Sequence, residues 1–211
     1  MRMLTKQNMH KAYLLISALV VLHGTILIMS AGGSFDVLAF RMFTPLSNYL
    51  VVVGFLAMLV LYNSKSKLRS YISAAVIVSI TVTALVYNLI LVPVVPEAEM
   101  ILSDYPNFAT HLLSALLVLF NYFFFEKKGQ FTFKHVLAGM AFPFAYWAMF
   151  VSIGGAIGFF PYFFMNPTEI GWAMTFAWFA IILAVIAVLG FLLVLFDRMR
   201  GRKAGVGDKA A

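Results

Sequence analysis

The stretch GWAMTFAWFAIILAVIAVLGFLLVLF, residues 171–196, contains no charged side chain and decides the fold. A helix that spans a bilayer needs about 20 mostly apolar residues, and this stretch exceeds that length. Five earlier stretches share its character, at residues 12–30, 44–63, 71–93, 108–125 and 135–156. The sequence therefore predicts an all-α, polytopic membrane protein with six transmembrane helices. We expect the first to be an uncleaved helix rather than a signal peptide, and the short connections predict one domain, residues 1–211.

Composition excludes most other classes of protein. Of the 211 residues, 63% are hydrophobic and only 11% are charged, which is too little charge for the surface of a soluble domain. The absence of cysteine rules out disulfides and thiolate metal sites. The net charge of +7 comes from basic residues at the ends of the apolar stretches. We interpret it as a topology signal, and we expect membrane lipids as partners, with no nucleic acid, metal or cofactor.

The positions of the basic residues predict the orientation. Fourteen of the 15 Lys and Arg residues fall in the N-terminal segment, the second and fourth connections and the C-terminal tail, so they share one side of the membrane. Arg41 is the exception, on the opposite side. The positive-inside rule then places both termini in the cytoplasm. His10 and His135 fall at the cytoplasmic edge, where we interpret them as interfacial.

Polar side chains in four of the predicted helices fall at similar depth. At about 1.5 Å of rise per residue, Thr44 lies at the outer end of the second helix, with Asn48 about one turn deeper. Asn88, His111 and His23 occupy the outer halves of the third, fourth and first helices. Because polar groups in hydrocarbon are costly and often functional, this coincidence predicts a shared polar pocket on the non-cytoplasmic side.

Each of these residues also has a purely structural interpretation. Thr44 before Pro45 is typical of a helix start, with Thr as the N-cap and Pro at the first helical position. Asn48 and Asn88 could simply join helices by hydrogen bonds. His23 by itself fits an interhelical residue better than a ligand.

Thr44 and His111 nevertheless carry chemistry. A threonine hydroxyl becomes nucleophilic when a base removes its proton, and a neutral imidazole is the usual base near pH 7. A helix N-terminus favours both a neutral imidazole and a developing oxyanion. Since Pro45 has no N–H, the candidate oxyanion donors are the backbone amides of Leu46 and Ser47, or the side chain of Asn48. These parts suit acyl transfer through a Thr-acyl intermediate that water resolves.

Two further roles stay open. No carboxylate within the predicted spans would orient His111, and the loop acids Asp104 and Glu169 are alternatives between which the sequence does not choose. Arg41 could bind a free carboxylate of a substrate. Alternatively, its side chain could extend its charged group to the membrane–water interface, as many long cationic side chains do.

Three segments resemble the family of androgen-induced and androgen-dependent TFPI-regulating proteins, with its bacterial six-helix relatives. FTPLSN at 43–48 resembles the family's Phe-Thr-x-x-Ser-Asn stretch at the head of helix two. THLLSALLVLFNY at 110–122 resembles its His-bearing helix, and FPFAYWAMFVSIGGAIGFFPYFFMNP at 142–167 resembles its Pro-x-Ala-Tyr helix and outer loop. The segments come in the family's order and cover most of the chain.

The resemblance implies an intramembrane threonine hydrolase, whose animal members cleave fatty acid esters of hydroxy fatty acids. The family's threonine falls on Thr44 and its histidine on His111. We expect Ser47, Asn48 and Asn88 to position the reacting groups. Candidate substrate contacts are Arg41, His23, Tyr146 and Tyr162, and the expected location is a bacterial plasma membrane.

This chain departs from the family pattern at two places. Ala115 stands where many bacterial members have Pro, which would alter only the shape of the helix. Asn121 stands near a position where they often have an acid, which puts in doubt a charge relay there.

A non-catalytic alternative uses the same pocket. The protein could bind or transport a lipid, or His23 and His111 could ligate a haem from two helices. Transport is disfavoured because the sequence shows neither paired intramembrane charges nor an inverted repeat. A scaffold or assembly role is neither favoured nor disfavoured by the sequence.

Overall fold

The computed structural model describes residues 5–94 and 104–207, and in these ranges the chain is helical, with no strand. Six helices are long and apolar enough to cross a membrane, which confirms the predicted number. These candidate spans are Lys6–Met29, Phe43–Val60, Leu68–Val94, Tyr105–Phe125, Phe133–Ile157 and Pro167–Arg202. The fold is therefore that of a multi-pass, all-α membrane protein. The cytoplasmic position of the termini remains a prediction.

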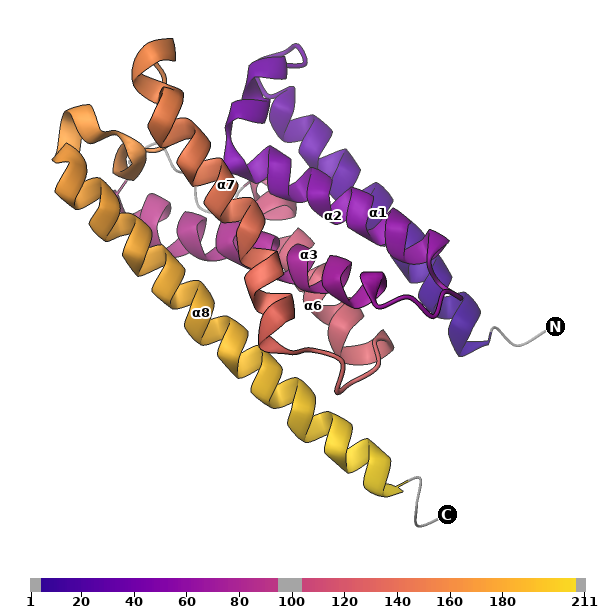
Figure 1. The fold of residues 1–211 in the computed structure, drawn as a ribbon. Helices are drawn as coiled ribbons and strands as arrows, with labels where there is room; N and C mark the ends of the chain where they lie inside the picture. The colour runs from indigo at the N-terminus through magenta and orange to yellow at the C-terminus, as the bar shows by residue number, and fades with distance from the viewer. Residues whose placement is uncertain (1–4, 95–103, 208–211) are drawn as a thin grey trace. The chain divides into compact units, whose positions relative to one another are not determined.

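Figure 1 shows the helices along the chain. The first two spans are α1 (Lys6–Met29) and α2 (Phe43–Val60). The third consists of α3 (Leu68–Leu85), η2 (Val86–Leu91) and α4 (Val92–Val94). The fourth consists of α5 (Tyr105–Phe108), η3 (Ala109–Leu113) and α6 (Ser114–Phe125). A 3-10 turn, η1 (Val37–Arg41), precedes α2. The last two spans are α7 (Phe133–Ile157) and α8 (Pro167–Gly207), with the 3-10 turn η4 (Phe163–Met165) before α8.

Each of the six spans begins before the apolar stretch that predicts it. α1 begins at Lys6, six residues before the predicted start, because the Thr5 side chain accepts a hydrogen bond from the Asn8 amide and caps it. Hydropathy marks only the part of a helix that suits lipid, whereas backbone hydrogen bonds continue into polar flanks. The predicted boundaries are therefore too short at this end.

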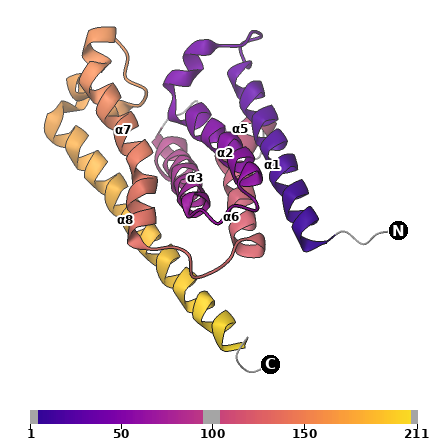
Figure 2. The same cartoon turned by 45° about the vertical axis from the view of Figure 1, so that its right-hand side comes forward.

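The chain forms two compact units, residues 1–127 and 128–211. The expectation of a single domain remains a prediction. In the first unit α1 packs against α2, α2 against α3, and α3 against α6, as Figure 2 also shows. The short segment η3 contacts α1, α2 and α3, so residues 109–113 lie at the centre of this unit.

Small residues allow this close approach. A Cβ added to Gly24 of α1 would lie 2.6 Å from the Cβ of Ala109 in η3, and one added to Gly54 of α2 would collide with Val76 of α3. Glycine at a helix contact brings backbones together where lipid supplies no hydrophobic drive. The glycines thus set the distance between the helices that carry the polar residues.

The second unit pairs α7 with α8. Gly158 ends α7 in the left-handed conformation, at φ 65°, and Gly171, at φ 77°, interrupts the start of α8. The carboxylate of the fully buried Asp197 accepts a hydrogen bond from the Phe131 amide at 2.8 Å. This bond fixes the segment before α7 against α8.

Candidate functional site

Thr44 and His111 meet in the first unit. Thr44 is in the first turn of α2 and His111 is in η3, and the distance from Thr44 Oγ1 to His111 Nε2 is 3.2 Å. Thr44 is half-buried, whereas His111 is only 6% exposed. The two residues paired by depth and chemistry in the sequence are therefore in hydrogen-bond contact.

The backbone fixes the tautomer of His111. Its Nδ1 lies 3.1 Å from the carbonyl oxygen of Asn107 and 3.3 Å from Oγ1 of Thr110. A carbonyl oxygen can only accept, so Nδ1 carries the proton and donates it to Asn107. Nε2 then has a free lone pair and accepts from the Thr44 hydroxyl. This is the arrangement that a general base needs.

Thr44 does not cap its helix, and the alternative prediction that it does is wrong. α2 begins at Phe43 with Met42 at the N-cap position, and no side chain caps it. The hydroxyl of Thr44 lies on His111 instead. Among the candidate oxyanion donors, the backbone amides of Leu46 and Ser47 donate to carbonyl oxygens four residues earlier in the helix. The N–H of Thr44, the second residue of α2, has no such partner within the helix.

Asn48 joins α2 to η3. Its Nδ2 donates to the carbonyl oxygens of Thr44 at 2.9 Å and Thr110 at 3.0 Å. Both N–H groups are thereby used, so the side chain fits a positioning role better than that of an oxyanion donor. Its Oδ1 is buried and has no hydrogen-bond partner among the described residues.

Ser47 continues the polar contacts toward α3. Its hydroxyl donates to the Thr44 carbonyl at 3.0 Å and lies 2.6 Å from Oγ1 of Thr83. Thr83 in turn reaches the carbonyl of Ser79 at 3.3 Å. Ser47 therefore ties the start of α2 to α3 and does not face the imidazole.

Tyr87 is a site residue that the sequence reasoning did not select. Its ring is stacked on that of His111, with ring centroids 3.5 Å apart and planes inclined by 19°. Each ring comes from a π-helical segment, Tyr87 from η2 and His111 from η3. Short π-helical segments within α-helices occur frequently at functional sites. The only sequence signal was the position of Tyr87 beside Asn88 in the predicted outer half.

The other predicted site residues in the first unit are Asn88, His23 and Arg41. Asn88 donates to the Ala84 carbonyl of its own helix at 2.7 Å. His23 is exposed, and its ring contacts Tyr105. Arg41 ends η1, three residues before Thr44 in the chain.

Tyr146 and Tyr162 belong to the second unit. Tyr146 is buried against Phe150, with ring centroids 4.9 Å apart, and Tyr162 is stacked on Phe164 at 5.2 Å. Their contact with a substrate held in the first unit remains a prediction.

Asp104 reaches the imidazole indirectly. Its carboxylate accepts hydrogen bonds from the backbone and side-chain amides of Asn107, at 3.3 and 3.1 Å, and the Asn107 carbonyl accepts from His111. Glu169, the other loop acid considered, lies at the start of α8 in the second unit. A backbone carbonyl thus takes the orienting role for which the sequence suggested a carboxylate.

A second polar cluster lies near the other ends of the same helices. We call it the His10 cluster: His10, Tyr62, Ser73, Asn121 and Glu126. His10 Nε2 lies 2.9 Å from Asn121 Oδ1, and Asn121 Nδ2 donates to Glu126 at 2.6 Å. Both oxygens of Glu126 also lie 2.8 Å from the Ser73 hydroxyl. His10 is 3% exposed, so it is buried within the protein, and its position at the membrane interface remains a prediction.

An apolar layer separates the two clusters along the helices. Between Asn48 and Tyr62, α2 buries Val51 and Phe55, and between Ser114 and Asn121, α6 buries Val118. These three apolar side chains are 2% exposed or less. The Thr44–His111 site is therefore a distinct feature of one end of the unit.

No family model, curated protein or solved structure matches this chain. The class of this protein is defined by its fold, that of a multi-pass helical membrane protein, and by its hydroxyl–imidazole pair. Within the described residues, no group of three or more His, Asp or Glu side chains could hold a metal ion.

Proposed function

We propose that the protein is an intramembrane lipid-ester hydrolase in which Thr44 is the nucleophile and His111 the general base. The observation that carries the proposal is the 3.2 Å contact between Thr44 Oγ1 and His111 Nε2, with Nδ1 held by the Asn107 carbonyl. It agrees with the activity implied by the resemblance to the androgen-induced and androgen-dependent TFPI-regulating family, to which we propose the chain belongs.

The first half-reaction forms an acyl-threonine. His111 Nε2 takes the hydroxyl proton as Thr44 Oγ1 attacks the ester carbonyl carbon. The oxyanion develops at the start of α2, where the helix dipole and the Thr44 N–H favour negative charge. When the tetrahedral intermediate collapses, the imidazolium returns its proton to the departing alcohol oxygen.

The second half-reaction releases the acid. A water molecule attacks the acyl-threonine carbonyl while His111 takes a proton from it. Collapse then breaks the bond to Thr44 Oγ1, which regains a proton from the imidazolium. Throughout, the Asn107 carbonyl accepts from Nδ1–H and partly balances the charge on the ring. The stacked ring of Tyr87 holds the plane of the imidazole.

The substrate class follows from the surroundings and from the resemblance. A site between membrane helices favours an ester with long acyl chains, such as a fatty acid ester of a hydroxy fatty acid. Arg41 precedes Thr44 by three residues and is suited to hold the free carboxylate of such a substrate. We place the protein in a bacterial plasma membrane, with the substrate entering from the outer leaflet.

Labelling with a fluorophosphonate tests the proposal. This probe reacts with activated hydroxyls, so detergent-solubilised wild-type protein should be labelled and Thr44→Ala should not be. Thr44→Ser is the matched control, because it keeps the hydroxyl and should retain labelling and ester cleavage. Hydrolysis of a fatty acid ester of a hydroxy fatty acid is measured in parallel. Cleavage that survives in Thr44→Ala would exclude Thr44 as the nucleophile.

A further inference from the structure

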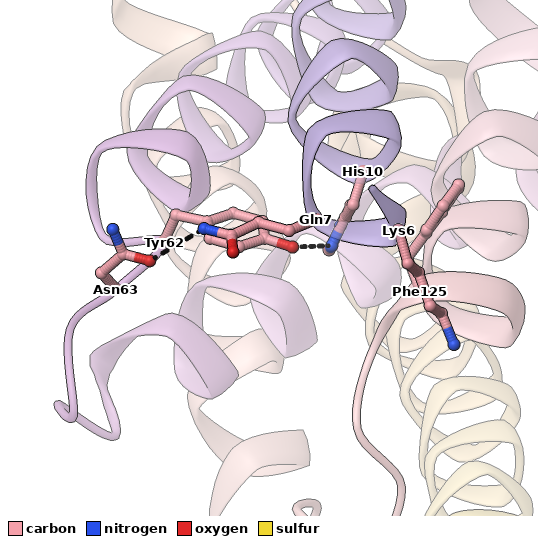
Figure 3. Close-up of a pocket in the computed structure, with 6 residues that line it drawn as sticks. All are labelled: Lys6, Gln7, His10, Tyr62, Asn63 and Phe125. Atoms are coloured by element: carbon pink, nitrogen blue, oxygen red, sulfur yellow. Dashed lines mark hydrogen bonds between the residues drawn. The ribbon is translucent and has the colours of Figure 1, made fainter. Parts of the chain in front are cut away.

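We propose that a pocket beside the His10 cluster binds the phosphate oxyanion of an anionic lipid headgroup. The pocket, of about 300 Å³, is lined by Lys6, Gln7, His10, Tyr62, Asn63 and Phe125, and Figure 3 shows these side chains. The site is independent of the proposed hydrolase activity, since the apolar layer separates it from Thr44 and His111.

Positive charge gathers at this pocket. Lys6 lines it directly. Lys11 Nζ lies 5.0 Å and the guanidinium carbon of Arg69 lies 4.7 Å from the centre of the Tyr62 ring, which forms part of its wall. A cation over an aromatic face keeps its full charge. Two cations therefore lie over the Tyr62 ring, and a third, Lys6, lines the pocket itself.

The acid next to the lining residue Phe125 in the chain, Glu126, is held by hydrogen bonds within the His10 cluster. None of the described residues that line the pocket carries a carboxylate. The acid of the His10 cluster, Glu126, is hydrogen-bonded to Asn121 and to Ser73, both 1% exposed. The lining thus contributes ammonium and amide groups, and guanidinium lies next to it, which are the donors that bind phosphate oxygens in proteins.

A hydrogen-bond chain builds the pocket wall in advance. Asn121 donates to Glu126, so its oxygen faces His10 and accepts from Nε2–H. Nδ1 of His10 then accepts from the Tyr62 hydroxyl, at 3.1 Å. Gln7, another lining residue, donates to Asn63 at 3.3 Å. The dashed bonds in Figure 3 join the start of α1 to the residues after α2 in these two places.

The surroundings favour a lipid as the source of the phosphate. The pocket lies where two candidate spans begin or end, at Lys6 and just beyond Val60, which is the level of lipid headgroups. Met9 on α1 and Phe124 on α6 are 49% and 63% exposed, and such side chains suit contact with acyl chains. A volume near the lower end of the range for ligand pockets, about 300–1,000 Å³, fits a headgroup and not a whole lipid.

Native mass spectrometry of the full chain in detergent tests this inference with phosphatidylglycerol, phosphatidylcholine and inorganic phosphate. The test variant is Lys6→Glu, which reverses a lining charge while placing an acid in the first turn of a helix, where it is tolerated. The matched control is Lys67→Glu, which makes the same change at an exposed residue just before α3, outside the pocket.

The wild type should retain phosphatidylglycerol in preference to phosphatidylcholine, and Lys6→Glu should weaken that retention about tenfold. Lys67→Glu should leave it within about twofold. Displacement of the lipid by millimolar inorganic phosphate would assign the site to the phosphate group itself, whereas retention would assign it to the complete headgroup; both support the oxyanion site. Equal retention of the two lipids, or equal weakening in both variants, would overturn the inference.

Discussion

The first unit contains two histidines that each accept a hydrogen bond from a hydroxyl group, yet their surroundings differ. His111 accepts from the alcohol of Thr44 and is oriented by a backbone carbonyl, at one end of the unit. His10 accepts from the phenol of Tyr62 and is oriented by Asn121, which is backed by the carboxylate of Glu126.

The difference teaches what a reactive arrangement requires. A carbonyl oxygen fixes the tautomer of His111 without adding a formal charge, and Thr44 is half-buried. Both histidines use both ring nitrogens, but His10 is oriented by the side chain of Asn121 and joins α1 to α6 and to Tyr62, just after α2. Polarity in a membrane protein is therefore insufficient to identify chemistry, and what distinguishes the Thr44 site is an aliphatic alcohol on an imidazole whose other nitrogen is held by a backbone carbonyl.

The largest effect is expected from exchanging each histidine for phenylalanine. His111→Phe keeps a ring on Tyr87 but removes Nε2, so ester cleavage should fall by about 10²–10⁴-fold, the usual contribution of a general base. His10→Phe keeps stacking on Phe125, whose ring centre is 4.7 Å away, and should retain cleavage per folded molecule. It should lower the stability by about 1–3 kcal/mol, because the buried Asn121 oxygen loses its donor. Rates and thermal unfolding are measured for both; equal loss of cleavage would abolish the distinction between the clusters.

The next effect is expected from Asn48→Leu. It removes hydrogen bonds to two carbonyls, each worth about 0.5–1.5 kcal/mol, and should lower the free energy of unfolding by about 1–3 kcal/mol. Asn88→Leu is the control, because it removes a single bond within its own helix and should cost about 0.5–1.5 kcal/mol. Denaturant or thermal unfolding gives both values. Similar losses in the two variants would contradict the joining role of Asn48.

Tyr87→Leu sharpens the comparison at the imidazole. Aromatic pairs contribute about 0.5–1.5 kcal/mol beyond buried area, so loss of the ring on His111 should lower ester cleavage by up to about tenfold. Tyr87→Phe keeps the stacked ring but lacks the hydroxyl, so it distinguishes the contribution of the ring from that of the hydroxyl. If Tyr87→Phe is as slow as Tyr87→Leu, orientation by stacking is not what Tyr87 contributes.

The smallest effect is expected from Asp104→Ala. This change removes the N-cap of α5 and the bonds to Asn107, so it should cost about 1 kcal/mol of stability and lower cleavage about two- to threefold through His111. Asp36→Ala is the control, since Asp36 caps η1 in the same way by accepting from the Leu38 amide. If the cleavage rates of the two variants fall equally, there is no specific connection between Asp104 and the imidazole.

Much of the fold was readable from the sequence. Apolar runs determine six candidate spans because transfer into lipid depends on composition averaged over about 20 residues. The rise per residue along an α-helix also predicted that Thr44 and His111 lie at a common depth in the membrane. Helix ends were less predictable, as at Lys6, because a side-chain cap and not hydropathy decides where the backbone bonds begin.

Only the tertiary structure decided what the polar residues do. Whether two side chains at one depth touch depends on the rotation of each helix about its axis, and π-helical segments alter that rotation at Tyr87 and His111. The orienting carbonyl of Asn107 carries no sequence signal, since every residue has one. The sequence determined which elements are candidate membrane spans and which chemistry is available; the packing of η3 against three helices decided that the Thr44 hydroxyl meets Nε2 of the imidazole.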